Sequence, residues 1–328
     1  MKKLISLVVT LVVTVVLILY AFDEVDFNQL GSTLAGGNYW VLIPFELMLF
    51  VFFWFNAVRW AMILRPIGVY TPRRLFSSMM IGFGGNNLLP ARLGEILRAF
   101  VFSKESGQPK SGVLVSLFVE RLLDVLAIFM FYLASVAIVH PFPESIRMGS
   151  QVMAWVLGVI AAGIFLFLRY PQFFQALWLK FSRWLPHTLR DKGTSILEGV
   201  TAGLSSLKSP GLVTGMVGLS LLRWALSGGM VWLSLYAYGN PISLGVCMIV
   251  VAVSALAVSL PSVPGFFGVI QAAFVFSLVP FGVDKESALA ASILFLLAQW
   301  GPVTVVGIAY FYASHMRVSD VAHEMETP

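Results

Sequence analysis

The 328-residue sequence is short of charge, of cysteine and of histidine. Charged residues make up 11% of the chain, whereas a soluble domain carries ~25%. The single cysteine, Cys247, excludes a disulfide within the chain, and the four histidines lie too far apart in the sequence to suggest a metal site. Because the chain also lacks a Walker loop, a dinucleotide fingerprint and a nucleophile elbow, we expect no cofactor and no ATP hydrolysis.

Hydrophobic residues, by contrast, make up 59% of the sequence, and its mean hydropathy is +0.89. They form long runs, of which Leu4–Phe22 and Trp40–Phe55 are the first two. A run of ~20 apolar residues crosses a ~30 Å hydrocarbon layer as a helix, and the alternation that a membrane β-barrel needs is missing. The sequence therefore predicts an all-α polytopic membrane protein. Basic loops, rather than nucleic-acid binding, explain the net charge of +5.

Basic residues indicate how the spans are oriented, because loops on the cytoplasmic side are rich in lysine and arginine. Lys2 and Lys3 place the N-terminus inside, and the acidic segment 23–29 lies outside. The basic segments 65–74 and 98–110 lie inside again. The first apolar run is too long for a signal peptide and is expected to be retained. Six full spans are predicted, at residues 4–22, 39–64, 112–139, 151–168, 211–238 and 288–312.

We expect residues 1–328 to form one transmembrane domain in the inner (cytoplasmic) membrane, with both termini in the cytoplasm. Residues 169–208 mix basic and aromatic side chains, which is typical of a cytoplasmic amphipathic linker in the headgroup layer. We expect residues 313–328 to form a short cytoplasmic tail.

Two segments do not fit a simple crossing. Residues 75–97 begin and end on the cytoplasmic side but are too short for two spans, so they predict a re-entrant hairpin. Residues 243–280 begin and end outside and are broken in the middle, which leaves a second re-entrant element and a pair of full spans as alternatives. The breaks share the pattern P-x-x-x-G-x-I, in Pro90–Ile96 and Pro264–Ile270. They predict an inverted repeat, in which a substrate site lies where the broken helices meet.

The first break contains polar residues that are costly inside a membrane. Asn86 and Asn87 can satisfy backbone groups that an irregular stretch leaves free. Arg92 lies in the first turn of the next helix, where the positive helix end and a guanidinium make an anion site. Glu95 and Arg98 follow on the same face. Either the three form a phosphate ladder in which Glu95 orients the arginines, or they are a salt-bridge set that holds the hairpin together. Arg98 is also close enough to the interface to snorkel.

Further charges lie deep in two full spans. Glu120, Arg121 and Asp124 come ~13–20 Å into their helix, near the bilayer centre. Arg121 can pair with Asp124, and we expect Arg121 and one carboxylate of this helix in the substrate cavity. A proton relay through Glu120 or Asp124 is a further alternative. Arg223 has no carboxylate within four positions and needs a partner from another helix or a substrate anion.

Other polar residues in the spans have plainer interpretations. Glu46 and Arg59 lie nearer the ends of the second span and are expected to snorkel or to form a structural pair. Gln271 and Gln299 are uncharged and are expected to make hydrogen bonds between helices.

These motifs resemble the flippase-like family of integral membrane proteins typified by the transmembrane portion of lysylphosphatidylglycerol synthase. The similar residues are N-x-L-P-A-R-x-G-E-x-x-R at Asn87–Arg98, E-R-x-x-D at Glu120–Asp124 and P-x-x-P-G-x-x-G at Pro261–Gly268. The resemblance covers nearly the whole chain and implies movement of a lipid between leaflets, with aminoacylated phosphatidylglycerol as the best-known cargo. We do not expect that cargo here, because the sequence has no soluble aminoacyl-transferring domain. Gln271 stands where the family pattern has a glutamate, which puts proton coupling at that position in doubt.

We expect a flippase or scramblase for an anionic phospholipid or a lipid-linked headgroup, and not an enzyme. The candidate substrate-binding residues are Asn86, Asn87, Arg92, Glu95, Arg98, Glu120, Arg121, Asp124, Arg223, Pro264, Gly265 and Gly268. The alternatives are a membrane-embedded transferase acting on a lipid-linked substrate and an accessory subunit of such an enzyme. The expected partner is the membrane lipid, with a homo-oligomer or a lipid-modifying enzyme as open alternatives and no nucleic acid.

Overall fold

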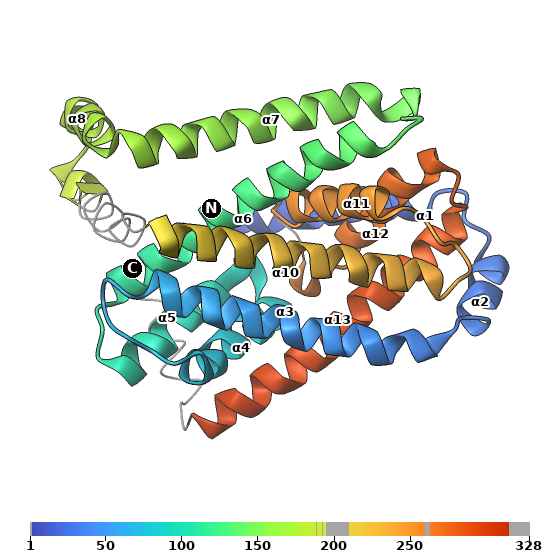
Figure 1. Ribbon diagram of the computed structural model, residues 1–328, viewed down its shortest axis with the longest axis horizontal. Helices are drawn as coiled ribbons and strands as arrows, with labels where there is room; N and C mark the ends of the chain where they lie inside the picture. The colour runs from blue at the N-terminus through green and yellow to red at the C-terminus, as the bar shows by residue number, and fades with distance from the viewer. Residues whose placement is uncertain (1, 188, 192, 195–209, 260–262, 315–328) are drawn as a thin grey trace.

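The computed structural model describes residues 2–187, 189–191, 193–194, 210–259 and 263–314, and within these ranges every regular element is a helix (Figure 1). The first half contains α1 (Lys2–Phe22), α2 (Phe27–Ala35), the 3-10 helix η1 (Tyr39–Val41), α3 (Leu42–Ile63), α4 (Pro72–Leu88), η2 (Pro90–Arg92), α5 (Leu93–Ser106) and α6 (Lys110–Ile138). The second half contains α7 (Glu144–Arg169), α8 (Pro171–Phe181), η3 (Ser182–Trp184), α10 (Pro210–Tyr236), α11 (Leu244–Ala257), η5 (Pro264–Phe266), α12 (Val269–Leu278), η6 (Val279–Phe281) and α13 (Lys285–Ala313). Most of the expected cytoplasmic tail and much of the predicted linker lie outside the described residues.

The prediction of an all-α polytopic membrane protein is confirmed. The six predicted full spans correspond to α1, α3, α6, α7, α10 and α13, which are 21 to 29 residues long. A helix of ~20 residues is ~30 Å long, so each of them is long enough to cross a bilayer. Among the described residues, five segments combine this length with sufficient apolarity: Tyr39–Ile63, Arg147–Phe167, Gly211–Tyr236, Pro264–Phe281 and Lys285–Ala313.

The two broken segments fold as helical hairpins. α4 packs on α5 and joins it through η2, and α11 packs on α12 and joins it across the break that contains η5. These helices have 17, 14, 14 and 10 residues, so at ~1.5 Å per residue none reaches ~30 Å alone. In Figure 1 the first hairpin lies in the left half of the bundle and the second in the right half, and η2 contacts η5 between them.

The two breaks share an uncommon backbone conformation. η2 begins at Pro90 and ends at Arg92, whose φ is 55°, and η5 begins at Pro264 and ends at Phe266, whose φ is 62°. A positive φ is uncommon for residues other than glycine, and here it recurs at the third position of both P-x-x-x-G-x-I motifs.

The helix packing repeats in the same way. The units α3–α6 and α10–α13 each consist of a long helix, a hairpin and a second long helix. α3 packs on α10, α4 packs on α13, and α11 packs on α6. Reciprocal contacts of this kind are expected of an inverted repeat.

The polar stretch before the first break is helical rather than irregular. Because α4 continues to Leu88, Asn86 and Asn87 lie in a regular helix, and the irregular stretch expected around them is wrong. The glycines serve helix packing instead. A Cβ on Gly84 would lie 3.1 Å from the Cα of Gly307 on α13, and a Cβ on Gly94 of α5 would lie 2.0 Å from the carbonyl oxygen of Gly82. Only glycine lets α5 and α13 approach α4 this closely.

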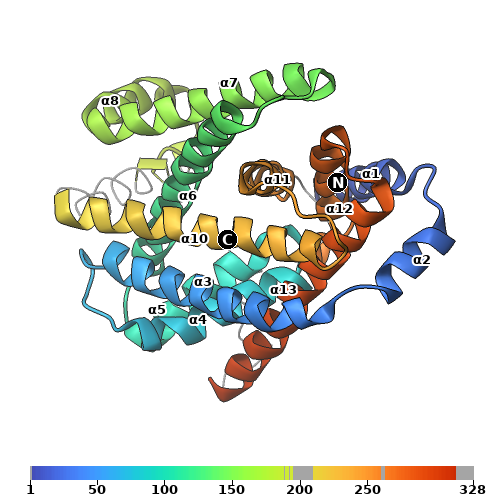
Figure 2. The same cartoon turned by 45° about the vertical axis from the view of Figure 1, so that its right-hand side comes forward.

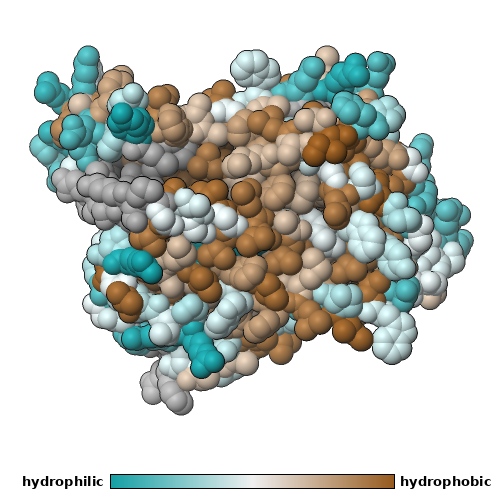
Figure 3. All heavy atoms as spheres, in the orientation of Figure 1, coloured by the Kyte–Doolittle hydropathy of each residue, from teal (hydrophilic) through white to brown (hydrophobic). Residues whose placement is uncertain are grey.

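α7 and α8 lie at the margin of the bundle, where α7 packs on α6 (Figures 1 and 2). α8 and η3 expose Phe173, Phe181 and Trp184. This surface has the exposed aromatic character of a helix lying in a headgroup layer. Figure 3 shows apolar residues over the middle of one face and hydrophilic residues at its two ends, as expected for helices that run across a bilayer.

Candidate functional site

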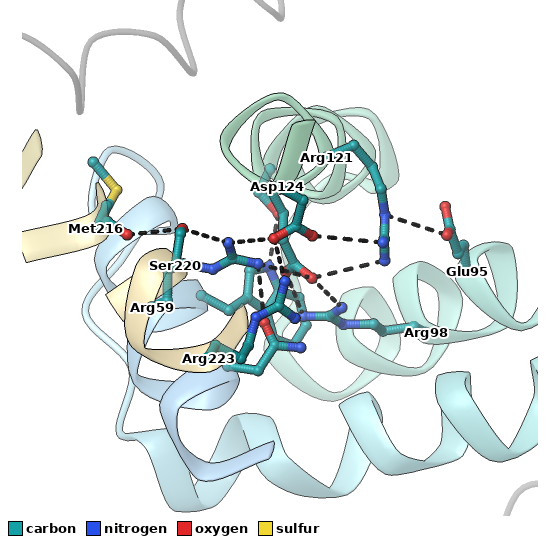
Figure 4. A network of polar contacts seen from close by, with 12 residues as sticks. Arg59, Glu95, Arg98, Arg121, Asp124, Met216, Ser220 and Arg223 are labelled. Atoms are coloured by element: carbon teal, nitrogen blue, oxygen red, sulfur yellow. Dashed lines mark hydrogen bonds and ion pairs between the residues drawn. The ribbon is translucent and has the colours of Figure 1, made fainter. Parts of the chain in front are cut away.

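Charged side chains from four helices meet inside the bundle (Figure 4). Arg59 comes from α3, Arg98 from α5, Glu120 and Asp124 from α6, and Arg223 from α10. Each residue is at most 3% exposed. The two carboxylates share a face of α6 because they are four residues apart. We call these five residues the ion cluster.

Each carboxylate of the ion cluster is held by two of its arginines. Arg98 binds Glu120 with Nη1 3.3 Å from Oε1 and Nη2 3.0 Å from Oε2, and Arg59 Nη2 lies 3.6 Å from the same Oε1. Asp124 Oδ1 accepts hydrogen bonds from Arg59 Nη1, at 2.7 Å, and from Arg223 Nη2. Arg59 therefore bridges the two carboxylates.

Neutral groups complete the ion cluster. Ser220 Oγ accepts a second hydrogen bond from Arg59 Nη1, at 2.7 Å. The guanidinium of Arg98 lies 3.7 Å from the ring centre of Trp60. Charge-assisted hydrogen bonds and cation–π contacts gain strength when they are desolvated. They offset part of the cost of removing these charges from water.

A cavity of about 250 Å³ lies between the two hairpins and next to the ion cluster, and its wall includes residues of both repeat units. Arg92, Glu95 and Arg121 supply the charged part of the wall. Arg121 Nε lies 3.4 Å from Glu95 Oε1, and Arg121 Nη1 lies 3.6 Å from Asp124 Oδ2. Arg121 thus connects the cavity to the ion cluster.

Arg92 lies where the two hairpins meet. It ends η2 and is the N-cap residue of α5, and its Nη2 donates a 2.6 Å hydrogen bond to the carbonyl oxygen of Val258, which follows α11. Arg92 forms no ion pair with a carboxylate of the described residues. A helix N-terminus and an arginine without an ion-pair partner both favour an anion at this point.

The ion cluster and the cavity wall together carry an excess of positive charge. The arginines are Arg59, Arg92, Arg98, Arg121 and Arg223, and the carboxylates are Glu95, Glu120 and Asp124. Five positive and three negative charges leave a net charge of two positive units. An unbalanced charge in a low-dielectric interior is costly, so this arrangement favours an anion in the cavity.

Two interactions that the sequence left open are settled by the packing of the helices. Arg223, which needed a partner from another helix or from a substrate, contacts Asp124 of α6. Arg98, for which snorkelling was an alternative, is 3% exposed and binds Glu120. Both arginines therefore stabilise the bundle.

The polar wall of the cavity differs from the expected one in two respects. The cavity wall contains Glu95 of α5, whereas the two α6 carboxylates, one of which was expected in the cavity, lie behind the wall, where Asp124 also pairs with Arg121. Asn86 and Asn87 line the cavity as part of a regular helix. Asn87 Nδ2 donates to Thr304 Oγ1 at 2.9 Å and to the backbone carbonyl oxygen of Trp300 at 3.3 Å, so it ties α4 to α13.

The second break contributes backbone geometry more than polar side chains. Pro264 and Gly265 form the turn of η5, and its next residue, Phe266, lines the cavity. Gly268, with a φ of 83°, precedes α12, and its N–H donates to Gln271 Oε1 at 2.7 Å. Gln271 therefore caps its own helix, and the prediction that it bonds to another helix is wrong.

Of the two alternatives expected for Arg59, snorkelling at an interface and a structural pair, the structure shows the second. Arg59 is fully buried at the centre of the ion cluster and pairs with Asp124, a depth that the sequence reasoning did not predict. A signal was available one turn earlier in the same helix. Asn56 is also fully buried, and its Oδ1 accepts a hydrogen bond from Arg59 Nη2 at 3.2 Å. Two polar residues three positions apart indicate a buried polar face.

Comparisons with known proteins place the chain among membrane proteins. Residues 4–307 match the family described as "Lysylphosphatidylglycerol synthase TM region". A UPF0104 membrane protein of Methanothermobacter thermautotrophicus is 24% identical over 285 residues, which cover 79% of this chain and 81% of that protein. A second UPF0104 membrane protein, of Methanocaldococcus jannaschii, is 23% identical over 229 residues, which cover 69% of this chain and 92% of that protein.

We predict that Asp124→Asn strongly destabilises the protein, because it leaves Arg59 and Arg223 buried without their shared carboxylate. Removing one partner of a buried ion pair costs ~3–5 kcal/mol, which corresponds to a fall in Tm of roughly 5 °C or more. Thermal unfolding of the detergent-solubilised protein, followed by tryptophan fluorescence, measures this change.

The matched control is Glu144→Gln. Glu144 and Arg147 form an exposed pair on α7 with the same spacing as Arg121 and Asp124. Exposed ion pairs contribute little to stability, so the Tm of the Glu144→Gln variant should differ from that of the wild type by no more than about 1 °C. Equal Tm values for the two variants would show that the ion cluster does not stabilise the bundle.

Proposed function

The chain belongs to the family of the transmembrane region of lysylphosphatidylglycerol synthase, and on this premise we propose that it moves a lipid with an anionic phosphate headgroup between the two leaflets of a membrane. The observation that carries the proposal is the excess positive charge of the cavity wall and of the ion cluster behind it. A charge near the bilayer centre is costly unless it is paired, and arginines in a cavity offset that cost for a phosphate. Arg92 and Arg121 hold the phosphate.

The residues of the site have two different tasks. The ion cluster is closed off from the cavity by its burial, and it fixes the positions of α3, α5, α6 and α10. Glu95 and Asp124 hold Arg121 on opposite sides, at 3.4 Å and 3.6 Å, which keeps its guanidinium at the cavity wall. The Arg121 and Glu95 side chains are 37% and 32% exposed, so a ligand can reach them.

An apolar cavity next to the site is suited to a hydrocarbon chain of the lipid. A cavity of about 300 Å³ is lined mainly by apolar residues of α1, α12 and α13. It shares Leu296 with the cavity between the two hairpins, so the two cavities are neighbours. A lipid with its headgroup at Arg92 can place a chain there and keep its hydrocarbon away from the charges. Burying a methylene group contributes ~0.8 kcal/mol.

We predict that Arg92→Gln and Arg121→Gln each slow lipid movement. The wild type is reconstituted into liposomes that contain phosphatidylglycerol with a fluorophore on one acyl chain, and bleaching by external dithionite reports the movement. Each variant should be slower by about tenfold or more, since a hydrogen bond to a charged group contributes ~1.5–3 kcal/mol.

The control for these variants is Arg147→Gln, since Arg147 is an exposed arginine on α7 outside the site. Its rate should equal that of the wild type. If the wild type moves no anionic lipid under either direction of a pH gradient, the proposal fails. A transferase is the alternative function, and it predicts chemically altered lipid when the liposome lipids are separated by chromatography.

We also propose that the α5–α6 loop lies in the cytoplasm and α2 on the opposite side of the inner membrane, because Lys104 and Lys110 flank the loop and α2 follows an acidic segment. A membrane-impermeant maleimide should label Asn28→Cys in intact spheroplasts and Ser111→Cys only after lysis. Both positions are exposed, and the native Cys247 is fully buried. The opposite labelling pattern would contradict this orientation.

A further inference from the structure

A further cavity, of about 290 Å³, lies beside the second hairpin and is bounded by α6, α7, α11 and α12. Among the described residues it shares no lining residue with the two cavities described above. α11 separates it from the cavity that contains Arg92. The residues of α11 that line it are Ile249, Val253, Leu256 and Ala257, whereas Val251, Ser254, Ala255 and, just after the helix, Val258 line the cavity at Arg92. At ~3.6 residues per turn these sets lie on opposite faces of α11. We call the further cavity the lateral cavity.

The wall of the lateral cavity does not suit water. Among the described residues that line it, only Tyr132 and Ser277 carry a side-chain nitrogen or oxygen atom, and both side chains are fully buried. A water molecule inside a protein needs ~2–4 polar partners, which two hydroxyl groups cannot supply to a water cluster in a cavity of this size. An empty cavity, in turn, leaves its lining without van der Waals contacts on one side. Hydrocarbon is therefore the occupant that fits this wall.

The lateral cavity opens on the surface of the bundle between α7 and α12. Gly149 of α7 and Phe276 of α12 both line it and both are exposed, and a Cβ on Gly149 would lie 3.7 Å from Phe276 Cζ. The surface beside this opening is apolar, since Val152 and Trp155 of α7 are 57% and 75% exposed. The segment Arg147–Phe167 is long and apolar enough to cross a bilayer. The opening therefore continues the surface that α7 presents to lipid.

α7 has few contacts of its own with the rest of the bundle. It lies at the margin in both views (Figures 1 and 2), and of the described helices it packs extensively only on α6. Helices in a bilayer associate through van der Waals packing, because lipid supplies no hydrophobic force between them. Gly149 and Met153 share one face of α7, and this face lines the lateral cavity opposite α11 and α12. An occupant of the cavity would connect α7 to the second hairpin.

The depth of the lateral cavity identifies the part of a lipid that reaches it. Its lining on α11 runs from Ile249 to Ala257. These residues lie ~8 to ~20 Å along the helix from its first residue, Leu244. Half of the hydrocarbon layer is ~15 Å thick. A lipid of the leaflet in which α11 begins would therefore place the terminal part of an acyl chain at this depth, with its headgroup well outside the cavity.

We propose that the lateral cavity binds the terminal part of an acyl chain of a bilayer phospholipid, and that this chain completes the packing between α7 and the second hairpin. The binding does not depend on the headgroup, since no charged residue of the described chain lines the lateral cavity. The site is separate from the one at Arg92 and Arg121, and it does not require that the protein moves lipid.

The test uses phosphatidylcholine with a photoreactive diazirine on one acyl chain, mixed into liposomes that contain the protein. One probe carries the diazirine near the end of the chain and a second carries it next to the ester group. After irradiation, mass spectrometry locates the attached lipid. In the wild type the first probe should label Met153 or Val253, and the second probe should leave both unlabelled. Trp155, which is exposed on α7, serves as a reference for labelling by bulk lipid.

A variant of α7 tests whether the labelled residues are reached through the lateral cavity. Gly149→Phe places a ring at its opening beside Phe276, so the labelling of Val253 should be lost while that of Trp155 is kept. The matched control is Gly163→Phe on the same helix, because Gly163 is exposed and a Cβ there would have no neighbour within 4 Å. This control should be labelled like the wild type.

Equal labelling of Val253 in the wild type and in Gly149→Phe would overturn the proposal. So would a wild type in which the first probe labels Trp155 but neither Met153 nor Val253, which is the result expected if a second copy of the chain fills the lateral cavity. If Gly149→Phe also loses the labelling of Trp155, the comparison of the two probes in the wild type decides. Lipid movement is not part of this measurement, so its outcome and that of the proposed function are independent.

Discussion

The structure depends on two carboxylates of α6 being shared among arginines that come from different helices. Lipid cannot solvate a charged group, so any of these helices that moved away would leave a charge buried without its partner. The ion cluster also joins the two repeat units, because Arg59 and Arg98 belong to the first and Arg223 belongs to the second. The same contacts that stabilise the bundle therefore set the distance between its halves, and with it the width of the cavity.

The two breaks share a local backbone feature but not their chemistry. Both breaks have a proline, a left-handed third residue and a glycine at the same positions. The charged residues of the first hairpin, Arg92, Glu95 and Arg98, correspond in the second motif to Phe266, Val269 and Ala272. The cavity wall therefore carries charged side chains on the first hairpin and none on the described part of the second. This asymmetry suits a molecule that is itself half charged and half hydrocarbon.

Much of the fold could be predicted from the sequence, because apolar length and basic loops are local properties of the chain. Even the hairpins could be expected, because residues 75–97 and 243–280 each begin and end on the same side of the membrane. The repeat was expected from the motif shared around Pro90 and Pro264. The partners of Arg59 and Arg223 could not be predicted, since Asp124 lies 65 and 99 residues away from them and only the packing of three helices brings them together. The helical conformation of Asn86 could not be predicted for the same reason, since it depends on how the helices pack. Glycines around it suggested an irregular tip, but close contacts with α5 and α13 keep α4 regular.

The central claim is that the phosphate of a lipid binds inside the bundle, between the two hairpins. The most direct measurement is an electron cryomicroscopy structure of the protein in nanodiscs that contain phosphatidylglycerol. The account predicts density for a lipid phosphate within hydrogen-bonding distance of Arg92 and Arg121, with its hydrocarbon leading toward the cavity between α1, α12 and α13. A cavity filled by hydrocarbon alone, with every lipid phosphate at the bilayer surface, would contradict it.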